Sequence, residues 1–125
     1  NNKNTYNIEK NISKRLLRII YTHCKINRNL SSEERIYLQM PDEEVTVYEG
    51  EGCQECRGTG YKGRTGIFEV LEINDRIKPL ISDKIDLGEI VRAAEKDGFT
   101  SLRQLAIRKM LEGSTTYDEV VSITG

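Results

Sequence analysis

The sequence has no tryptophan, only two prolines and one histidine, and almost no excess of charge of either sign. Its 19 Lys and Arg residues are interspersed with 20 Asp and Glu residues, so the basic field that attracts a phosphate backbone is missing and nucleic acid is not an expected partner. No apolar run is long enough to span a membrane, and no charged segment precedes an apolar core as in a signal peptide. We therefore expect a cytoplasmic chain that does not insert directly into a membrane.

The motifs of a nucleotide-dependent enzyme are also missing. No Gly-x-x-x-x-Gly-Lys-Ser/Thr loop is present to hold phosphates, and His23, the single histidine, has no evident catalytic partner. The glycines Gly58-x-Gly60-x-x-Gly63 imitate a dinucleotide fingerprint, but they precede an expected strand instead of joining a strand to a helix. We therefore expect the chain by itself to have no catalytic residues and to bind no nucleotide.

Three cysteines are an odd number, which favours metal binding or free thiols in a reducing compartment over a disulfide framework. Cys53-x-x-Cys56 has the spacing of a zinc knuckle, and the glycines that surround it allow tight turns. We call residues 52–60 the thiol knuckle. A closed structural zinc site needs four ligands, and this pair supplies two.

Hydrophobic periodicity predicts an α+β fold. Apolar residues recur at helical spacing through residues 8–20 and predict an amphipathic helix there, with residues 1–6 as a polar lead-in. Ser31-x-x-Glu34 is a capping box that predicts a short helix, and Pro41 ends it. The β-branched and aromatic runs at residues 45–48 and 67–73 predict strands.

The C-terminal part is predicted to form about four short helices. They begin near residues 74, 86, 101 and 116, and Gly98 and Gly113 end the second and third. Pro79 limits the regularity of the first. The pattern therefore divides the chain into residues 1–20, a knuckle subdomain at 21–73 and a helical bundle at 74–125.

Two segments resemble a known family. Cys53-x-x-Cys56 followed by Thr59-Gly60-Tyr61-x-Gly63-Arg64-x-Gly66-Ile67-x-Glu69 resembles the signature near the C-terminal end of the secretion ATPases that drive type II secretion and type IV pilus assembly. Gly98-Phe99-x-x-Leu102-x-x-x-Ala106 and Gly113-x-Thr115-Thr116-x-x-Glu119-Val120 resemble that family's closing helical subdomain. Cys53-x-x-Cys56-x-Gly58-x-Gly60 is also similar to one repeat of the DnaJ-type zinc modules, which need several copies.

The resemblance implies a C-terminal fragment of a hexameric cytoplasmic ATPase, with residues 1–20 at the edge of an ATPase core that lies upstream of Asn1. ATP and Mg²⁺ would then belong to the parent protein, and the fragment would serve a structural and coupling role. The implied partners are neighbouring subunits of the homo-hexamer and inner-membrane assembly proteins, through which the parent lies at the periphery of that membrane. The alternative is a free-standing zinc-knuckle module that binds a protein partner.

The resemblance also supplies a third candidate metal ligand. Tyr21-Thr22-His23-Cys24 falls where the family has its first Cys-x-x-Cys, with Tyr21 in place of the first cysteine. Cys24, Cys53 and Cys56 are therefore the candidate zinc ligands, and His23 or a water molecule is the candidate for the fourth position. In the other interpretation the chain has lost its metal, and the cysteines are small buried apolar residues.

Overall fold

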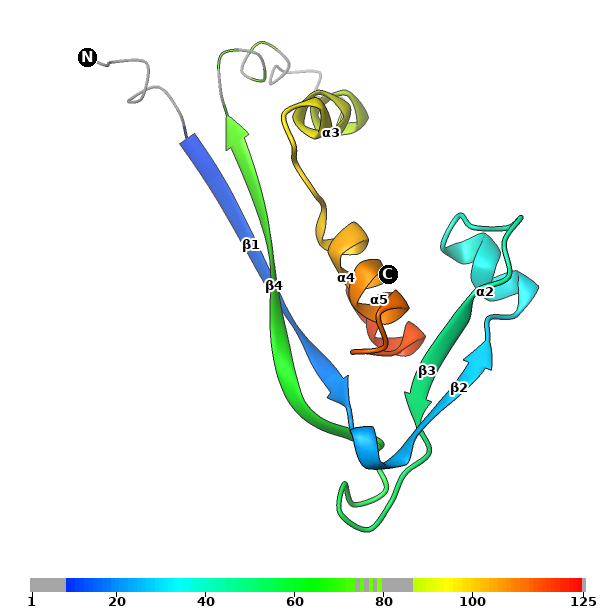
Figure 1. Cartoon of the computed structure of the whole chain (residues 1–125). Helices are drawn as coiled ribbons and strands as arrows, with labels where there is room; N and C mark the ends of the chain where they lie inside the picture. Colours follow the sequence, from blue (N-terminus) through cyan, green and yellow to red (C-terminus); the bar gives the residue numbers. More distant parts are fainter. Residues whose placement is uncertain (1–8, 74, 76, 78, 80–86, 125) are drawn as a thin grey trace. The chain divides into compact units, whose positions relative to one another are not determined.

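The computed structural model describes residues 9–73, 75, 77, 79 and 87–124 (Figure 1). Its strands are β1 (Glu9–Ile20), β2 (Lys25–Asn29), β3 (Thr46–Gly50) and β4 (Tyr61–Ile73). Its helices are the 3₁₀ turn η1 (Thr22–Cys24), α2 (Ser32–Tyr37), α3 (Leu87–Lys96), α4 (Leu102–Leu111) and α5 (Tyr117–Thr124). The predicted α+β class is confirmed, and none of the described helices is long and apolar enough to cross a membrane.

The predicted N-terminal helix is wrong, because its described residues form strand β1. β1 pairs with β4, and Figure 1 shows the two strands running in opposite directions. The apolar spacing that suggested a helix, as between Ile12 and Leu16, is four residues, which also returns to the same face of a strand. Backbone pairing with a segment far along the chain decided between the two.

Strands β2 and β3 form a second, antiparallel sheet, in which Lys25 pairs with Gly50 and Asn29 with Thr46. Helix α2 lies between them in sequence and has the predicted capping box: the Ser31 side chain accepts from the Glu34 N–H, and the Glu34 carboxylate accepts from the Ser31 N–H. The predicted strands at 45–48 and 67–73 are confirmed, but β4 begins earlier, at Tyr61.

Three of the predicted C-terminal helices are confirmed as α3, α4 and α5. The first predicted helix, near residue 74, falls largely on residues outside the described part of the chain. Gly98 and Gly113 follow α3 and α4 with φ of 92° and 88°, the left-handed conformation that ends a helix.

The chain forms two compact units. Unit 1 comprises residues 1–15 and 68–102, and unit 2 comprises residues 16–67 and 103–125. The core of unit 1 consists of Ile73, Ile77, Ile90 and Ala94, with Phe99 packed against it. The fully buried side chains of unit 2 include Leu17, Val47, Ala106, Met110 and Val120. This division differs from the three successive segments expected from the sequence, whose boundaries stay a prediction.

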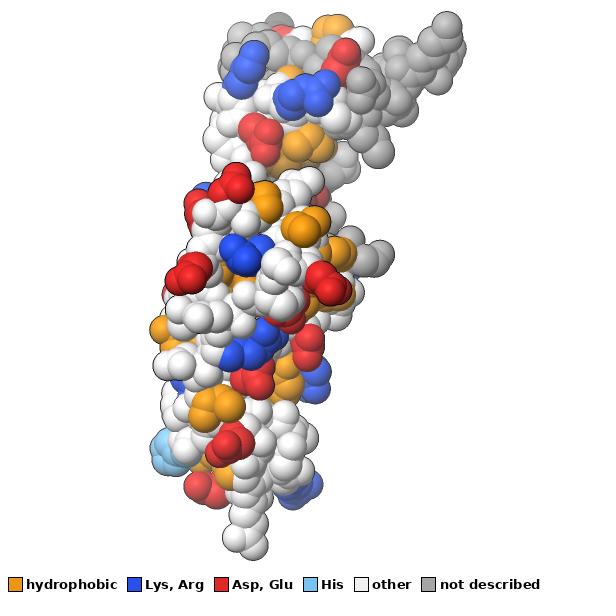
Figure 2. All heavy atoms as spheres, turned by 90° about the vertical axis from the view of Figure 1, so that its right-hand side faces the viewer, with side chains coloured by type: hydrophobic (Ala, Val, Ile, Leu, Met, Phe, Trp, Pro, Cys, Tyr) orange, Lys and Arg blue, Asp and Glu red, His pale blue; other side chains and the backbone are white. Residues whose placement is uncertain are grey.

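Acidic and basic side chains are interspersed on the face that Figure 2 presents, as the balanced composition suggests. Charge of one sign does not gather into a large patch there. This face thus agrees with the sequence expectation about charge.

Candidate functional site

The three cysteines meet in unit 2. Cys24 is the last residue of η1, whereas Cys53 and Cys56 lie in the thiol knuckle between β3 and β4. The Sγ atom of Cys56 is 3.5 Å from that of Cys53 and 3.9 Å from that of Cys24. All three sulfur atoms lie within 4.8 Å of one another. The structure thus brings together the three cysteines that the sequence singled out, close enough to bind a metal.

Backbone hydrogen bonds fix the thiol knuckle. The N–H of Gly58 donates to the carbonyl of Cys53 at 2.8 Å, and the hydroxyl of Thr59 donates to the carbonyl of Cys56 at 2.7 Å. Arg57 and Gly58 take φ of 58° and 78°, so the chain turns back after Cys56. This turn aims the N–H groups of Cys53 and Gly60 at the Cys56 sulfur, at 3.2 and 3.1 Å.

The surroundings shift the pKa values of two of the thiols in opposite directions. Burial, the largest influence on Cys56, raises its pKa, but the N–H groups of Gly60 and Cys53 and the thiols of Cys53 and Cys24 stabilise the thiolate and lower its pKa to about 6. Burial raises the pKa of the Cys24 thiol. The two N–H groups therefore favour the thiolate of Cys56, the protonation state that a metal requires.

The sulfur atoms fit part of a zinc site. A tetrahedral site with Zn–S bonds of about 2.3 Å places its sulfur atoms about 3.8 Å apart, and the observed separations of 3.5 and 3.9 Å lie on either side of that value. Among the residues with described positions, no His, Asp or Glu atom joins the three sulfur atoms as a fourth ligand. Three possible metal ligands therefore lie together in the described part of the chain.

Tyr21 and His23, the residues near the expected fourth position, contact each other. Their rings stack with centroids 4.9 Å apart, and the Tyr21 hydroxyl lies 3.3 Å from His23 Nδ1. The same hydroxyl donates to the Glu55 carboxylate at 3.0 Å, and this bond raises the pKa of Tyr21. Tyr21 is thus a neutral phenol bound to the knuckle, and no sequence pattern predicts its contact with Glu55.

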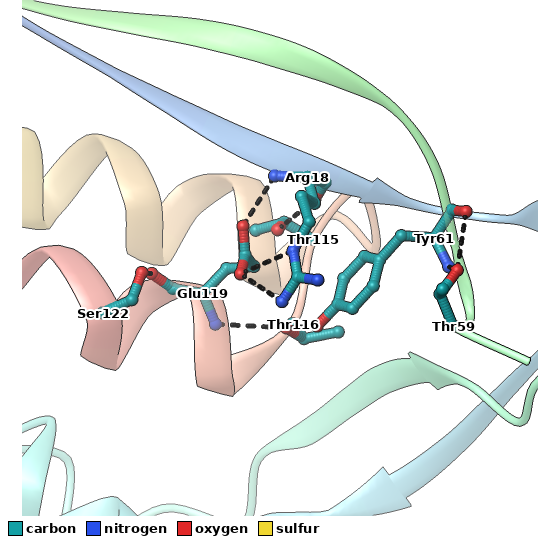
Figure 3. Close-up of polar contacts among 7 residues, drawn as sticks. All are labelled: Arg18, Thr59, Tyr61, Thr115, Thr116, Glu119 and Ser122. Carbon is teal, nitrogen blue, oxygen red and sulfur yellow. Dashed lines mark hydrogen bonds and ion pairs between the residues drawn. The ribbon is translucent and has the colours of Figure 1, made fainter.

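A second polar cluster in unit 2 joins α5 to β1 and β4 (Figure 3). The Glu119 carboxylate accepts from the backbone N–H of Arg18 at 2.7 Å and from its guanidinium at 3.1 and 3.2 Å. The same guanidinium lies over the Tyr61 ring, 4.0 Å from its centroid. The hydroxyls of Tyr61 and Thr116 are 2.7 Å apart, and Thr115 donates to the carbonyl of Arg18 at 2.7 Å.

The sequence pattern predicts only part of this cluster. Thr116-x-x-Glu119 was predicted as the start of a helix, and the Thr116 hydroxyl does accept from the Glu119 N–H at 3.2 Å. The Glu119 side chain does not contact that turn alone, because its carboxylate reaches Arg18, 101 residues away in sequence. No local pattern signals such a partner.

The chain matches the family described as "Type II/IV secretion system protein" over residues 4–122. It is 34% identical over 118 residues to the type IV pilus assembly ATPase TfpB of Acinetobacter baylyi and 36% identical over 116 residues to the type IV pilus assembly ATPase PilB of Thermus thermophilus. It is also 35% identical over 114 residues to type II secretion system protein E of Pseudomonas aeruginosa.

Each alignment covers 90% of this chain but only 20%, 13% and 22%, respectively, of these relatives. The chain therefore spans about a fifth or less of the length of the curated proteins that it matches. Because the family match covers nearly the whole chain, the chain belongs to the type II/IV secretion system protein family.

Proposed function

We propose that this chain is the C-terminal part of a cytoplasmic ATPase that powers type IV pilus assembly or type II secretion. The match to this family over residues 4–122, with relatives named as pilus assembly ATPases, is the observation that carries the proposal. The chain has no phosphate-binding loop of its own, so ATP and Mg²⁺ would bind elsewhere in the parent protein.

The role of this part is structural and mechanical. Unit 2 ties α5 to β1 through buried Glu119 and Thr115, and a rigid connection of this kind transmits a displacement of one element to the other. The parent would act as a homo-hexamer, and its movement would reach neighbouring subunits and assembly proteins at the inner membrane. The protein would be peripheral to that membrane through these partners.

The candidate metal ligands are Cys24, Cys53 and Cys56. We propose that zinc is the metal, because thiolates suit it and two of the three sulfur separations, 3.5 and 3.9 Å, are close to those of a tetrahedral zinc site. The fourth position would hold a water molecule or His23. In the structure His23 Nδ1 lies 3.3 Å from the Tyr21 hydroxyl. Zinc bound here would fasten η1 to the thiol knuckle.

The protein encoded by the full reading frame tests the coupling proposal. It should hydrolyse ATP and restore pilus assembly or secretion to a strain that lacks the gene, whereas the 125-residue chain alone should hydrolyse none. Glu119→Ala in the full protein should reduce assembly more than it reduces ATP hydrolysis, because it loosens a transmitting contact outside the nucleotide site. Asp118→Ala, at the exposed neighbouring position, is the matched control.

A reading frame without a phosphate-binding loop would overturn the proposal. It would favour the alternative of a free-standing zinc-knuckle module, whose supporting feature is the geometry of the three sulfur atoms. Equal losses of hydrolysis and assembly in Glu119→Ala would contradict the coupling role alone.

A further inference from the structure

The family resemblance implies four cysteine ligands, and this chain has tyrosine at the first of them. A metal in a four-thiolate site cross-links two turns that would otherwise separate, and such small sites commonly unfold without it. Here the two turns are residues 21–24 and the thiol knuckle. We propose that Tyr21 replaces the missing metal–sulfur bond as the cross-link between these two turns, so that they stay together with or without a metal.

The Tyr21 side chain makes the link from one turn to the other. Its residue is 9% exposed, and its hydroxyl donates to the carboxylate of Glu55, which stands between Cys53 and Cys56. The Tyr21 ring also has two neighbours: His23 stacks on it, and Lys62 Nζ lies 5.2 Å from its centroid. A hydrogen bond from a neutral phenol to a carboxylate is charge-assisted and stronger than a neutral one.

The backbone holds the same two turns together without any ion. The N–H of Tyr21 donates to the carbonyl of Gly60, and the N–H of Glu51 donates to the carbonyl of Cys24, both at 2.9 Å. These bonds bracket the cysteine cluster, one at each side of the knuckle. With the Tyr21–Glu55 bond, two bonds join residues 21–24 to the knuckle itself and a third joins them to Glu51, directly before it, so closure does not need a bond through sulfur.

The inference goes beyond the proposed role in secretion and does not depend on it. It also changes what zinc would do at the three thiols. Zinc bound there would add to a turn that is already closed, and its fourth corner would be open to exchange, so its loss would leave the fold in place. In a four-cysteine knuckle, metal loss removes the cross-link itself.

Thermal unfolding of the whole chain tests this, in reductant, with its zinc content measured before and after treatment with a chelator. The midpoint of the wild-type chain should change by less than about 2 °C when zinc is removed. Tyr21→Phe and Glu55→Ala should each lower the zinc-free midpoint by about 3–6 °C, and the double variant should lower it by about as much as either single variant. Glu55 is largely exposed, so its replacement leaves the chain able to fold.

Two matched controls should leave the midpoint unchanged. Tyr48→Phe removes a hydroxyl that has no hydrogen-bond partner within the described residues, and Glu51→Ala removes an exposed carboxylate from the same loop.

Tyr21→Cys should convert the site into a four-thiolate site. Its zinc-free midpoint should fall, equimolar zinc should restore it, and Co²⁺ should give the visible absorption of a tetrahedral thiolate site.

Three outcomes would overturn the inference. The wild-type midpoint could fall by about 10 °C or more on zinc removal, which would make the metal the cross-link. Tyr21→Phe and Glu55→Ala could unfold like the wild type, which would leave the phenol without this role. The two substitutions could also be additive, which would separate Tyr21 from Glu55. None of these outcomes bears on ATP hydrolysis by the full protein.

Discussion

The Glu119 carboxylate accepts hydrogen bonds from both the backbone and the guanidinium of Arg18, 101 residues earlier in the chain. The two groups differ in exposure, since the Arg18 side chain is 54% exposed and the Glu119 side chain 10%. The carboxylate is therefore the buried partner, and its hydrogen bonds to Arg18 offset the free-energy cost of burying its charge. This pair fixes the start of α5 against β1.

Glu119→Gln should destabilise the chain by about 2 kcal/mol, because the amide can accept only through one oxygen and its NH₂ group would face the donors of Arg18. Urea unfolding at pH 7 measures the change. Asp118→Asn alters the same charge at the neighbouring exposed position and should cost less than about 0.5 kcal/mol. A Glu119→Gln chain as stable as Asp118→Asn would mean that the ion pair contributes nothing.

Thr116 links the same helix to β4. Its hydroxyl caps the N–H of Glu119 at 3.2 Å and lies 2.7 Å from the Tyr61 hydroxyl. Thr116→Val should lower the free energy of unfolding by about 1–2 kcal/mol, because it removes both bonds while keeping the shape of the side chain. Tyr61→Phe breaks only the second bond and should cost about 1 kcal/mol.

Thr116→Ser keeps the hydroxyl and should recover most of the loss. Equal stability of the Val and Ser variants would show that the hydroxyl does not matter. Tyr61→Phe also retains the ring under the Arg18 guanidinium, so a larger loss than in Thr116→Val would point to a partner of the phenol other than Thr116.

Two glycines pass each other closely where the knuckle leaves β3 and enters β4. A Cβ built on Gly60, whose φ is 84°, would lie 2.6 Å from the carbonyl oxygen of Gly50, and a Cβ on Gly50 would collide with the backbone of Gly60. Gly60→Ala should therefore cost about 3 kcal/mol, from backbone strain and from the clash together. Chemical denaturation of the whole chain gives this number.

Gly58 supplies the comparison. It has a similar φ of 78°, but a Cβ there would meet nothing within 4 Å. Gly58→Ala should cost only about 1 kcal/mol, the strain alone. Gly50→Ala carries the clash without a positive φ and should also be severe. Similar losses at Gly58 and Gly60 would show that the close approach has no energetic consequence.

Local chemistry predicted much of this fold, and long-range pairing accounts for what it missed. The capping box at Ser31 and the glycines after α3 and α4 act within a few residues of themselves, so the sequence located these helices correctly. Strand β1 was misassigned because its apolar spacing fits both a helix and a strand, and β4 is more than 40 residues away. No pattern within residues 9–20 indicates that this segment pairs with β4.

The candidate site divides in the same way. The spacing of Cys53 and Cys56 alone predicts a metal-binding turn, and the family resemblance adds Cys24 as a candidate ligand. The sequence does not predict the role of Tyr21. A tyrosine in place of a cysteine indicates only that a ligand is missing, whereas the hydrogen bond from Tyr21 to Glu55 depends on how the two turns meet. Arg18 was hidden for the same reason, since its partner lies on the last helix.

The ion pair between Arg28 and Glu34 makes stability depend on acid pH. Arg28 Nη1 lies 2.7 Å from the Glu34 carboxylate, and its Nε lies 2.7 Å from Glu49. The bond from Arg28, more than any other influence, lowers the pKa of Glu34 to about 2; the Ser31 N–H acts in the same direction and burial opposes them. In the unfolded chain this carboxyl has its ordinary pKa near 4.5.

Because the folded pKa is below the unfolded one, the stabilisation is fully present above about pH 4.5 and is lost as the pH falls through about 2. Glu34→Gln keeps the capping box but removes the charge, so it should be less stable than the wild type by about 1 kcal/mol at pH 7, a value reduced by solvent screening of this partly exposed pair. The difference should shrink steadily between pH 4.5 and pH 2 in unfolding experiments at constant ionic strength. A gap that stays constant over this range would show that Glu34 stabilises α2 through its hydrogen bonds alone and that its charge adds nothing.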